Sequence, residues 1–184
     1  MSTISDTPAS IGTIALPTAG TIILEDSGVH YPDFALTFTL VNVRIPVTDA
    51  AASGAAGSLK IFDFVKGAVH FEGCHQGYTA FTEGATLTGG AGDAAFKIGV
   101  GTAVAPAADN ALTGTAVNVG AAVNVTLAGG VGSGTAVTAP DAIIDGNTSP
   151  VDLYLNVSGS AASVDATSYI DVTGTVTVRG TFVG

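Results

Sequence analysis

The C-terminal stretch Ser168–Val183 alternates with a period of two between apolar or small residues and polar ones. Successive side chains of a β-strand point to opposite faces of a sheet, so the pattern predicts one long strand with a buried face. The set expected in the core is Ser168, Ile170, Val172, Gly174, Val176, Val178, Gly180 and Phe182. The set expected on the outer face is Tyr169, Asp171, Thr173, Thr175, Thr177, Arg179 and Thr181.

A second long run, Phe34–Val47, alternates in the same way but changes phase once. Phe34, Leu36, Phe38 and Leu40 share one face, after which the apolar set becomes Val41, Val43, Ile45 and Val47. A slip of one residue moves every later side chain to the other face, so we expect a β-bulge or a bend from one sheet into another. Pro46 indicates a strand end or an edge.

Further runs of β-branched and apolar residues predict more strands, and no stretch has the pattern of an amphipathic helix. The expected strands are Thr21–Glu25, Ser58–Glu72, Ala94–Ala103, Thr115–Leu127 and Pro150–Val157. The expected loops are Thr48–Gly57, the irregular region Gly73–Asp93 and residues 128–150, all rich in Gly, Ala, Ser or Thr.

Seven to nine such strands bury their alternating faces most simply in two packed antiparallel sheets. We therefore predict an all-β protein, an antiparallel β-sandwich of jelly-roll-like form. Residues 1–20, rich in Ser, Thr, Pro and Ala, are expected to be an extended N-terminal arm that orders on contact with a neighbour. Residues 21–184 are expected to form a single domain.

Charged residues make up only 11% of the 184 residues, against about 25% in an ordinary soluble domain. Much of the surface must then consist of Ala, Gly, Ser and Thr, which pack readily against another flat surface. This favours a protein made for permanent assembly. An extracellular β-protein with a Thr- and Ser-rich surface is the alternative.

The formal net charge is −10, and the five basic residues are scattered, so no cationic stripe exists to follow phosphates. Nucleic acid and anionic membranes are therefore not expected as partners. The single cysteine, Cys74, cannot form an intramolecular disulfide. The N-terminus lacks the pattern of a signal peptide and no apolar run reaches the length of a membrane span, which indicates synthesis and folding in a cytoplasm.

One cluster has metal-ligand chemistry: His70, Glu72, Cys74 and His75. Its spacing matches no established zinc pattern, so a strand end with solvated histidines and a buried thiol is the favoured interpretation. Asp141, Asp145 and Asn147 offer oxygen ligands beside a glycine, but not at calcium-loop spacing, which favours an ordinary turn. No metal or cofactor is expected.

Catalytic patterns are missing as well. The acids Glu25, Asp63, Glu72, Glu83 and Asp171 are scattered over separate segments, and no G-x-S-x-G or phosphate-binding loop occurs. No catalytic residue is assigned, and the chain is not expected to be an enzyme. Four aromatic residues have the chemistry to stack on sugars but are more typical of core or interface anchors: Tyr78, Phe81, Tyr154 and Tyr169.

The C-terminal third has a pattern seen elsewhere. Residues 149–157, SPVDLYLNV, then a small-residue loop, then residues 170–178, IDVTGTVTV, resemble the endings of small capsid decoration (cement) proteins of tailed bacteriophages. The rest of the chain resembles such virion proteins in composition. The resemblance implies a β-sandwich, often a homotrimer, that binds the major capsid protein on the capsid surface.

The expected function is therefore structural: stabilisation of a phage capsid from outside. Several modest contacts made by linked copies would gain avidity. The competing hypothesis is a glycan- or host-binding β-sandwich module of a phage fibre or adhesin.

Overall fold

The computed structural model describes residues 12–15, 17–26, 33–49, 55–83, 95–106, 112–126, 134–138, 142–159 and 168–183. It is an all-β protein with two antiparallel sheets, as the sequence predicts. The first sheet contains β1 (Gly12–Ile14), β4 (Thr48–Asp49), β5 (Ala55–Phe64), β7 (Ala95–Gly101), β8 (Gly120–Thr126) and β11 (Asp152–Gly159). The second contains β2 (Thr21–Asp26), β3 (Asp33–Pro46), β6 (Ala68–Glu83), β9 (Gly134–Thr138), β10 (Ala142–Ile144) and β12 (Tyr169–Val183).

Both sheets are built around long central strands. The first has the order β1-β5-β11-β7-β8 and the second β10-β6-β12-β3-β2. The short strands β1 and β4 pair with different ends of the same side of β5, and β9 and β10 do the same on β6. Each sheet is therefore five positions wide, although six strands contribute to it.

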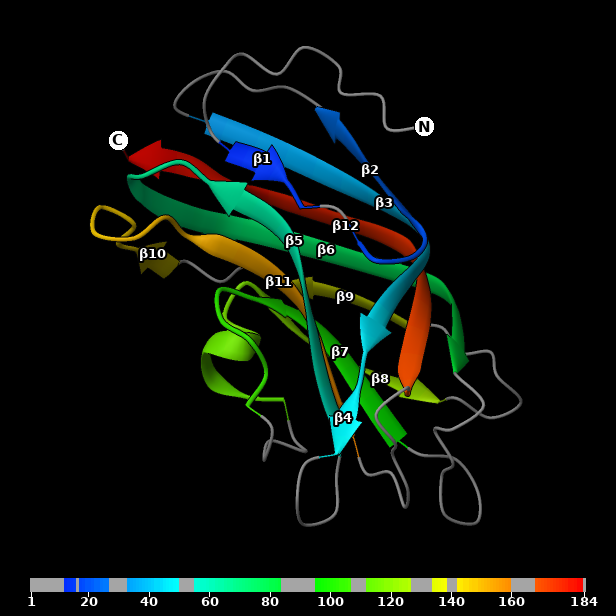
Figure 1. Ribbon diagram of the computed structural model, residues 1–184. Helices are drawn as coiled ribbons and strands as arrows, with labels where there is room; N and C mark the ends of the chain where they lie inside the picture. Colours follow the sequence, from blue (N-terminus) through cyan, green and yellow to red (C-terminus); the bar gives the residue numbers. More distant parts are fainter. Residues whose placement is uncertain are drawn as a thin grey trace.

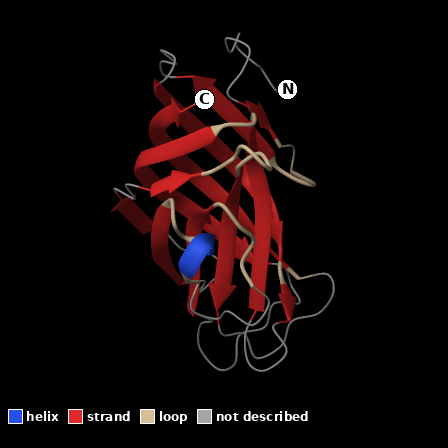
Figure 2. Cartoon of the chain, turned by 90° about the vertical axis from the view of Figure 1, so that its left-hand side faces the viewer, coloured by secondary structure: helices blue, strands red, loops and turns tan. Residues whose placement is uncertain are grey.

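The two sheets face each other across one hydrophobic core (Figures 1 and 2), as in a β-sandwich. Aromatic rings from the two sheets pack against each other in this core. The ring centres of Phe38 in β3 and Phe62 in β5 are 5.9 Å apart, and those of Phe64 in β5 and Phe71 in β6 are 5.7 Å apart. On one side β8 of the first sheet lies beside β9 of the second. The burial of these rings away from water is the main favourable term in the stability of such a core.

The predicted alternation of the two long strands is confirmed. In β12 all the residues predicted to face the core are buried. In β3 the buried set changes from Phe34, Leu36, Phe38 and Leu40 to Val43, Ile45 and Val47. The prediction that Val41 belongs to the second apolar set is wrong, because Val41 lies in the bulge and is 42% exposed. The chain then passes from β3 in the second sheet to β4 in the first, just after Pro46.

The predicted single strand Ser58–Glu72 is wrong, since the chain turns at residues 65–67 between β5 and β6. Gly67 causes the break: its φ of +146° suits glycine, and a Cβ there would lie 2.3 Å from the ring of Phe182. Its amide also donates to the carbonyl of Gly146.

The predicted irregular region beginning at Gly73 is also wrong, because β6 continues to Glu83. Register shifts occur where β6 meets β12 near Gly174 and near Gly180, so the alternation of β6 is interrupted twice. Its buried positions also include the polar residue Gln76. These two features hide the strand from a search for periodic apolar residues.

Parts of other predicted loops are strands. The Thr48–Gly57 loop includes β4 and the start of β5, and residues 128–150 include β9 and β10. The first residues of the predicted strand Thr115–Leu127 lie in a 3-10 turn, Gly114–Ala116. Within the predicted arm, β1 pairs with β5, while residues 1–11 lie outside the described residues. The helical content of the described residues includes nothing long and apolar enough to cross a membrane.

Candidate functional site: the threonine face

The outer face of the second sheet carries a row of hydroxyl side chains, and we call it the threonine face. Because alternate residues of β12 fill the core, the remaining ones must point outward from the middle of the sheet. The face includes these outward residues of β3, β12 and β6: Asp33, Ala35, Thr37, Thr39, Val41, Asn42, Arg44, His70, Glu72, His75, Gly77, Thr79, Thr82, Tyr169, Asp171, Thr173, Thr175, Thr177, Arg179, Thr181 and Val183.

Short side chains, mainly threonine, occupy the centre of this face. Thr37 and Thr177 are opposite each other on β3 and β12, and their hydroxyl oxygens are 3.0 Å apart in a hydrogen bond. Thr175 is paired with Thr39 on one side and with Gly77 on the other, and it is exposed. Cross-strand threonine pairs of this kind stabilise a sheet without burying apolar surface.

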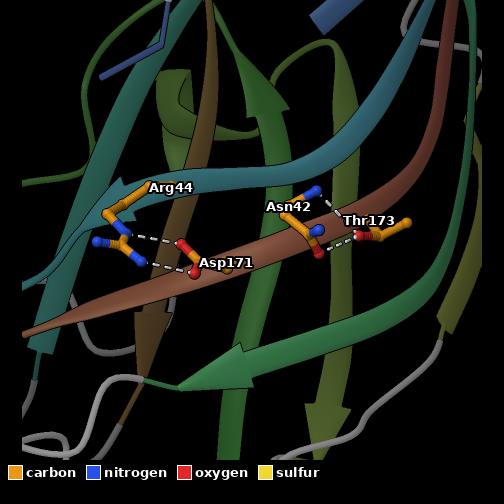
Figure 3. Close-up of polar contacts among 4 residues, drawn as sticks. All are labelled: Asn42, Arg44, Asp171 and Thr173. Carbon is orange, nitrogen blue, oxygen red and sulfur yellow. Dashed lines mark hydrogen bonds and ion pairs between the residues drawn. The ribbon is translucent and has the colours of Figure 1, made fainter. Parts of the chain in front are cut away.

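The bulge in β3 is fixed by a side-chain contact across the sheet (Figure 3). Asn42 has a φ of +49°, in the left-handed region. Its backbone amide donates to the hydroxyl oxygen of Thr173 over 3.1 Å, and the Thr173 hydroxyl donates to Asn42 Oδ1 over 3.2 Å. Asparagine is among the residues that tolerate this conformation best, so its presence explains where the phase slip occurs.

A prediction for this bulge separates backbone strain from the lost side chain. Asn42→Val is expected to destabilise the protein by about 1–2 kcal/mol relative to Asn42→Gly, because a β-branched residue is strained at positive φ. Both variants lose the acceptor for Thr173, so their difference does not include that hydrogen bond. Urea unfolding measures it, and equal stability of the two variants would contradict the assignment of strain.

Beyond the bulge, Arg44 of β3 and Asp171 of β12 form a bidentate ion pair (Figure 3). Nε and Nη2 of Arg44 each donate to one carboxylate oxygen over 2.8 Å. The guanidinium carbon also lies 3.4 Å from the ring centre of Tyr169. The hydrogen bond with Asp171 raises the pKa of Arg44, although partial desolvation opposes it. The side chain is thus held flat against the sheet rather than free in solvent.

At the opposite end of the face two carboxylates share one hydroxyl group. The hydroxyl oxygen of Thr181 is 3.0 Å from Asp33 Oδ1 and 2.9 Å from Glu72 Oε1. One hydroxyl proton can serve only one acceptor at a time. Nδ1 of His70 lies 3.6 Å from Glu72 Oε1. We call Asp33 and Glu72 the acid pair.

The candidate metal residues do not converge. His70 and Glu72 point outward, whereas Cys74 points into the core because the bulge near Glu72 reverses the phase, and His75 points outward again. Among the described residues no group of three or more His, Cys, Asp or Glu side chains is placed to hold a metal ion. Asp145 accepts hydrogen bonds from the backbone amide and side chain of Asn147, as in an ordinary Asx turn, and Asp141 lies outside the described residues.

Cys74 belongs to a buried polar group that joins the two sheets. Gln76 is fully buried. Its Nε2 donates to the carbonyl of Ala121, the second residue of β8, and its Oε1 accepts a hydrogen bond from the hydroxyl of Tyr78. A Cβ at Gly120 would lie 2.7 Å from Gln76 Nε2 and 2.8 Å from Cys74 Sγ, so the glycine leaves room for both side chains. The sequence did not single out Gln76, since only strand pairing shows that it points inward.

These buried groups predict loss of stability in alkaline solution. Burial raises the pKa of Cys74 from 9.0 to about 12. Burial also raises the pKa of Tyr78 well above 10.0, with the charge of Cys74 adding to it. Since both pKa values are higher in the folded state, their contribution is fully present below pH 9.0 and is lost as the pH rises toward the folded values.

Urea unfolding at increasing pH measures this loss, and Cys74→Ala is the matched control. The variant removes the first titration, so its free energy of unfolding should begin to fall near pH 10.0, the ordinary value for Tyr78, rather than near pH 9.0. Identical pH profiles for both proteins would show that the Cys74 thiol is not buried as described.

One pair of neighbouring carboxylates was not predicted from the sequence. Asp63 of β5 and Asp152 of β11 are register partners, and Lys60 Nζ contacts Asp63 Oδ1 at 2.8 Å and Asp152 Oδ2 at 3.2 Å. The Tyr154 hydroxyl donates to Asp152 over 2.8 Å. Partial burial raises the pKa of Asp152, but hydrogen bonds with Asp63, Tyr154 and Lys60 outweigh it and lower the pKa overall. Lys60 thus bridges the two carboxylates, as in a structural ion-pair network.

The aromatic candidates for sugar stacking have other contacts. Tyr78 and Phe81 are buried against each other with ring centres 5.4 Å apart. Tyr169 is covered by Arg44, and Tyr154 is bonded to Asp152. They therefore do not form one exposed platform.

The outer face of the first sheet is different, because the chain itself covers part of it. Residues 102–106 and 112–119, the covering segment, lie over β11 and β5, held by Asn156. Figure 2 shows the helical turn of this segment in blue beside the strands. Comparisons with family models, curated proteins and solved structures each gave no match to this chain.

Proposed function

We propose that this chain is a structural protein of a bacteriophage particle that binds the outside of the capsid and stabilises the shell. The observation that carries the proposal is the threonine face, a broad sheet surface of nearly balanced charge that suits contact with another protein of the particle. Two of its charged side chains, Arg44 and Asp171, are already paired with each other within the sheet. A preorganised surface loses little side-chain entropy when another protein covers it.

The wider proposal includes features that the sequence pattern predicts. The sandwich is taken to have jelly-roll-like connectivity, and residues 1–20 to contribute an arm that reaches a neighbour. The partners are the major capsid protein and further copies of the chain, as a homotrimer, with no direct contact to nucleic acid or membrane. The location is the capsid surface of the virion, reached after synthesis in the host cytoplasm.

The contacts of the aromatic residues favour this function over glycan binding. A sugar-binding platform needs an exposed ring face. Burial of Tyr78 and Phe81, and the guanidinium group over Tyr169, leave these rings engaged. That the chain is not an enzyme stays a prediction.

A binding experiment on particles tests the proposal. The purified chain is mixed with capsids assembled from the major capsid protein of the same phage, and the mixture is sedimented. We expect saturable binding at a fixed number of copies per capsid, and a shell that withstands higher temperature. A chain that stays in the supernatant, or that binds defined glycans on an array instead, would refute the proposal.

A further inference from the structure

The two outer faces of the sandwich differ in how far other segments of the chain cover them. On the first sheet, the covering segment buries Asn156 completely although this side chain points away from the core. On the second sheet, central outward residues such as Thr175, His75 and Arg179 are exposed. Among the described residues, the threonine face is therefore a broad surface available to another molecule.

The size of the threonine face suits a protein interface. β12 has 15 residues and lies between β3 and β6, which have 14 and 16. At about 3.4 Å per residue and about 4.8 Å per strand, these three strands span roughly 700 Å². A standard interface buries about 800 Å² on each partner.

Charge indicates which partner this face accepts. On the three strands, the described outward side chains carry three carboxylates, Asp33, Glu72 and Asp171, and two guanidinium groups, Arg44 and Arg179. With neutral histidines their formal charge is −1, whereas the whole chain carries −10. Two copies of so acidic a protein repel each other over most of their surface, and least where the local charge is nearly balanced.

The face also offers complementary groups to its own copy. Arg179 is exposed and has no ion pair among the described residues. The acid pair Asp33 and Glu72, on the same face, has more acceptor oxygens than the single hydroxyl of Thr181 can satisfy. A second copy brings both a cation for the acid pair and carboxylates for the cation.

We propose that the threonine face binds a second copy of this chain. The inference rests on the proposed function for the expectation that the protein works as an assembly, and it assigns the surface through which the copies meet. Two identical faces that pack together give a two-fold dimer, while the same face packed against a different surface of the next copy gives a ring such as a trimer.

Analytical ultracentrifugation of the full chain and two arginine variants tests this assignment. Thr175→Arg places a long charged side chain in the middle of the face, whereas Asn124→Arg places the same side chain at an exposed position of β8 in the other sheet. We expect an oligomer for the unchanged chain and for Asn124→Arg, and a folded monomer for Thr175→Arg. Circular dichroism and thermal unfolding show whether each variant is folded.

A third variant, Arg179→Glu, removes the cation while leaving the threonine row intact. We expect its dissociation constant to rise about tenfold or more, because like charges then meet across the interface. An unchanged chain that is monomeric at every concentration, or a folded Thr175→Arg that stays oligomeric, overturns the inference. Neither result affects the capsid-sedimentation test, so a protein that binds capsids as a monomer keeps the proposed function and loses only this assignment.

Discussion

Replacing Asn156 with alanine is expected to destabilise the protein by about 2–4 kcal/mol, because buried polar groups lose their partners at once. Nδ2 of Asn156 donates to the carbonyls of Ala103 and Ala116 over 2.9 and 2.8 Å. Its Oδ1 accepts from the Ser58 hydroxyl at 2.6 Å and from the amide of Ala105 at 3.1 Å. One side chain therefore bonds to both parts of the covering segment, residues 102–106 and residues 112–119, and holds them on the first sheet.

The expected loss depends on burial as much as on the number of hydrogen bonds. Asn156 has an exposed fraction of 0%, so water cannot replace the lost contacts without moving the covering segment. The amide of Ala105 keeps the Ser58 hydroxyl oxygen as an acceptor at 2.8 Å, which limits the loss. The two carbonyls of the covering segment lose this donor outright.

Asn118→Ala is the matched control. Asn118 also lies in the covering segment and bonds to the amide and hydroxyl of Thr102, but it is only partly buried. Because solvent can replace those contacts, the loss should stay below about 1 kcal/mol. Urea unfolding gives both values, and faster hydrogen exchange at the Ala105 amide in the Asn156 variant would locate the effect. Equal losses for the two variants would show that Asn156 does not anchor the segment.

Sequence reasoning succeeded where one physical signal dominated. Strict alternation predicted the strand β12 and which of its residues face the core, because a strand in a sheet with one buried face alternates between apolar and polar residues. The phase slip in β3 was visible for the same reason, and the structure adds its cause, the left-handed backbone of Asn42. That cause was not visible beforehand, since asparagine is common in many other settings.

Sequence reasoning failed where tertiary contacts decide the local structure. The end of β5 depends on Gly67, which is required because the ring of Phe182, over a hundred residues later, leaves no room for a side chain. The part of β6 from Gly73 onward was missed because the two bulges of this strand are set by its pairing with β12. The burial of Asn156 also depends on a tertiary contact, because its outward position on the strand becomes buried only when a distant segment folds over it.

The candidate site shows the same division. The outward threonines of β12 followed from alternation, but their hydroxyl partners on β3 required the register between strands. The pairing of Asp171 with Arg44, and of Asp63 with Asp152, likewise joins residues far apart in the chain. Composition predicted a weakly charged surface, and only the sheet order shows which face carries the balanced charges.

The second large effect is expected from Phe62, which joins the two sheets through the core. Its side chain is fully buried, with its ring centre 5.9 Å from that of Phe38 in the opposite sheet and 4.8 Å from that of Phe64. Phe62→Ala removes most of a ring that touches both layers and leaves a cavity that the surrounding strands cannot close. The expected loss is about 3–5 kcal/mol, as for other buried aromatic residues.

Phe62→Leu separates lost volume from lost ring geometry, because leucine keeps most of the apolar contact. Its expected loss is smaller, about 1–2 kcal/mol, and Val65→Ala, at a 38% exposed position in the next turn, should cost less than about 0.5 kcal/mol. Urea unfolding of the three variants ranks them. If alanine at position 62 cost no more than alanine at position 65, the sheets would not be packed against each other through this ring, and the two-layer core would be wrong.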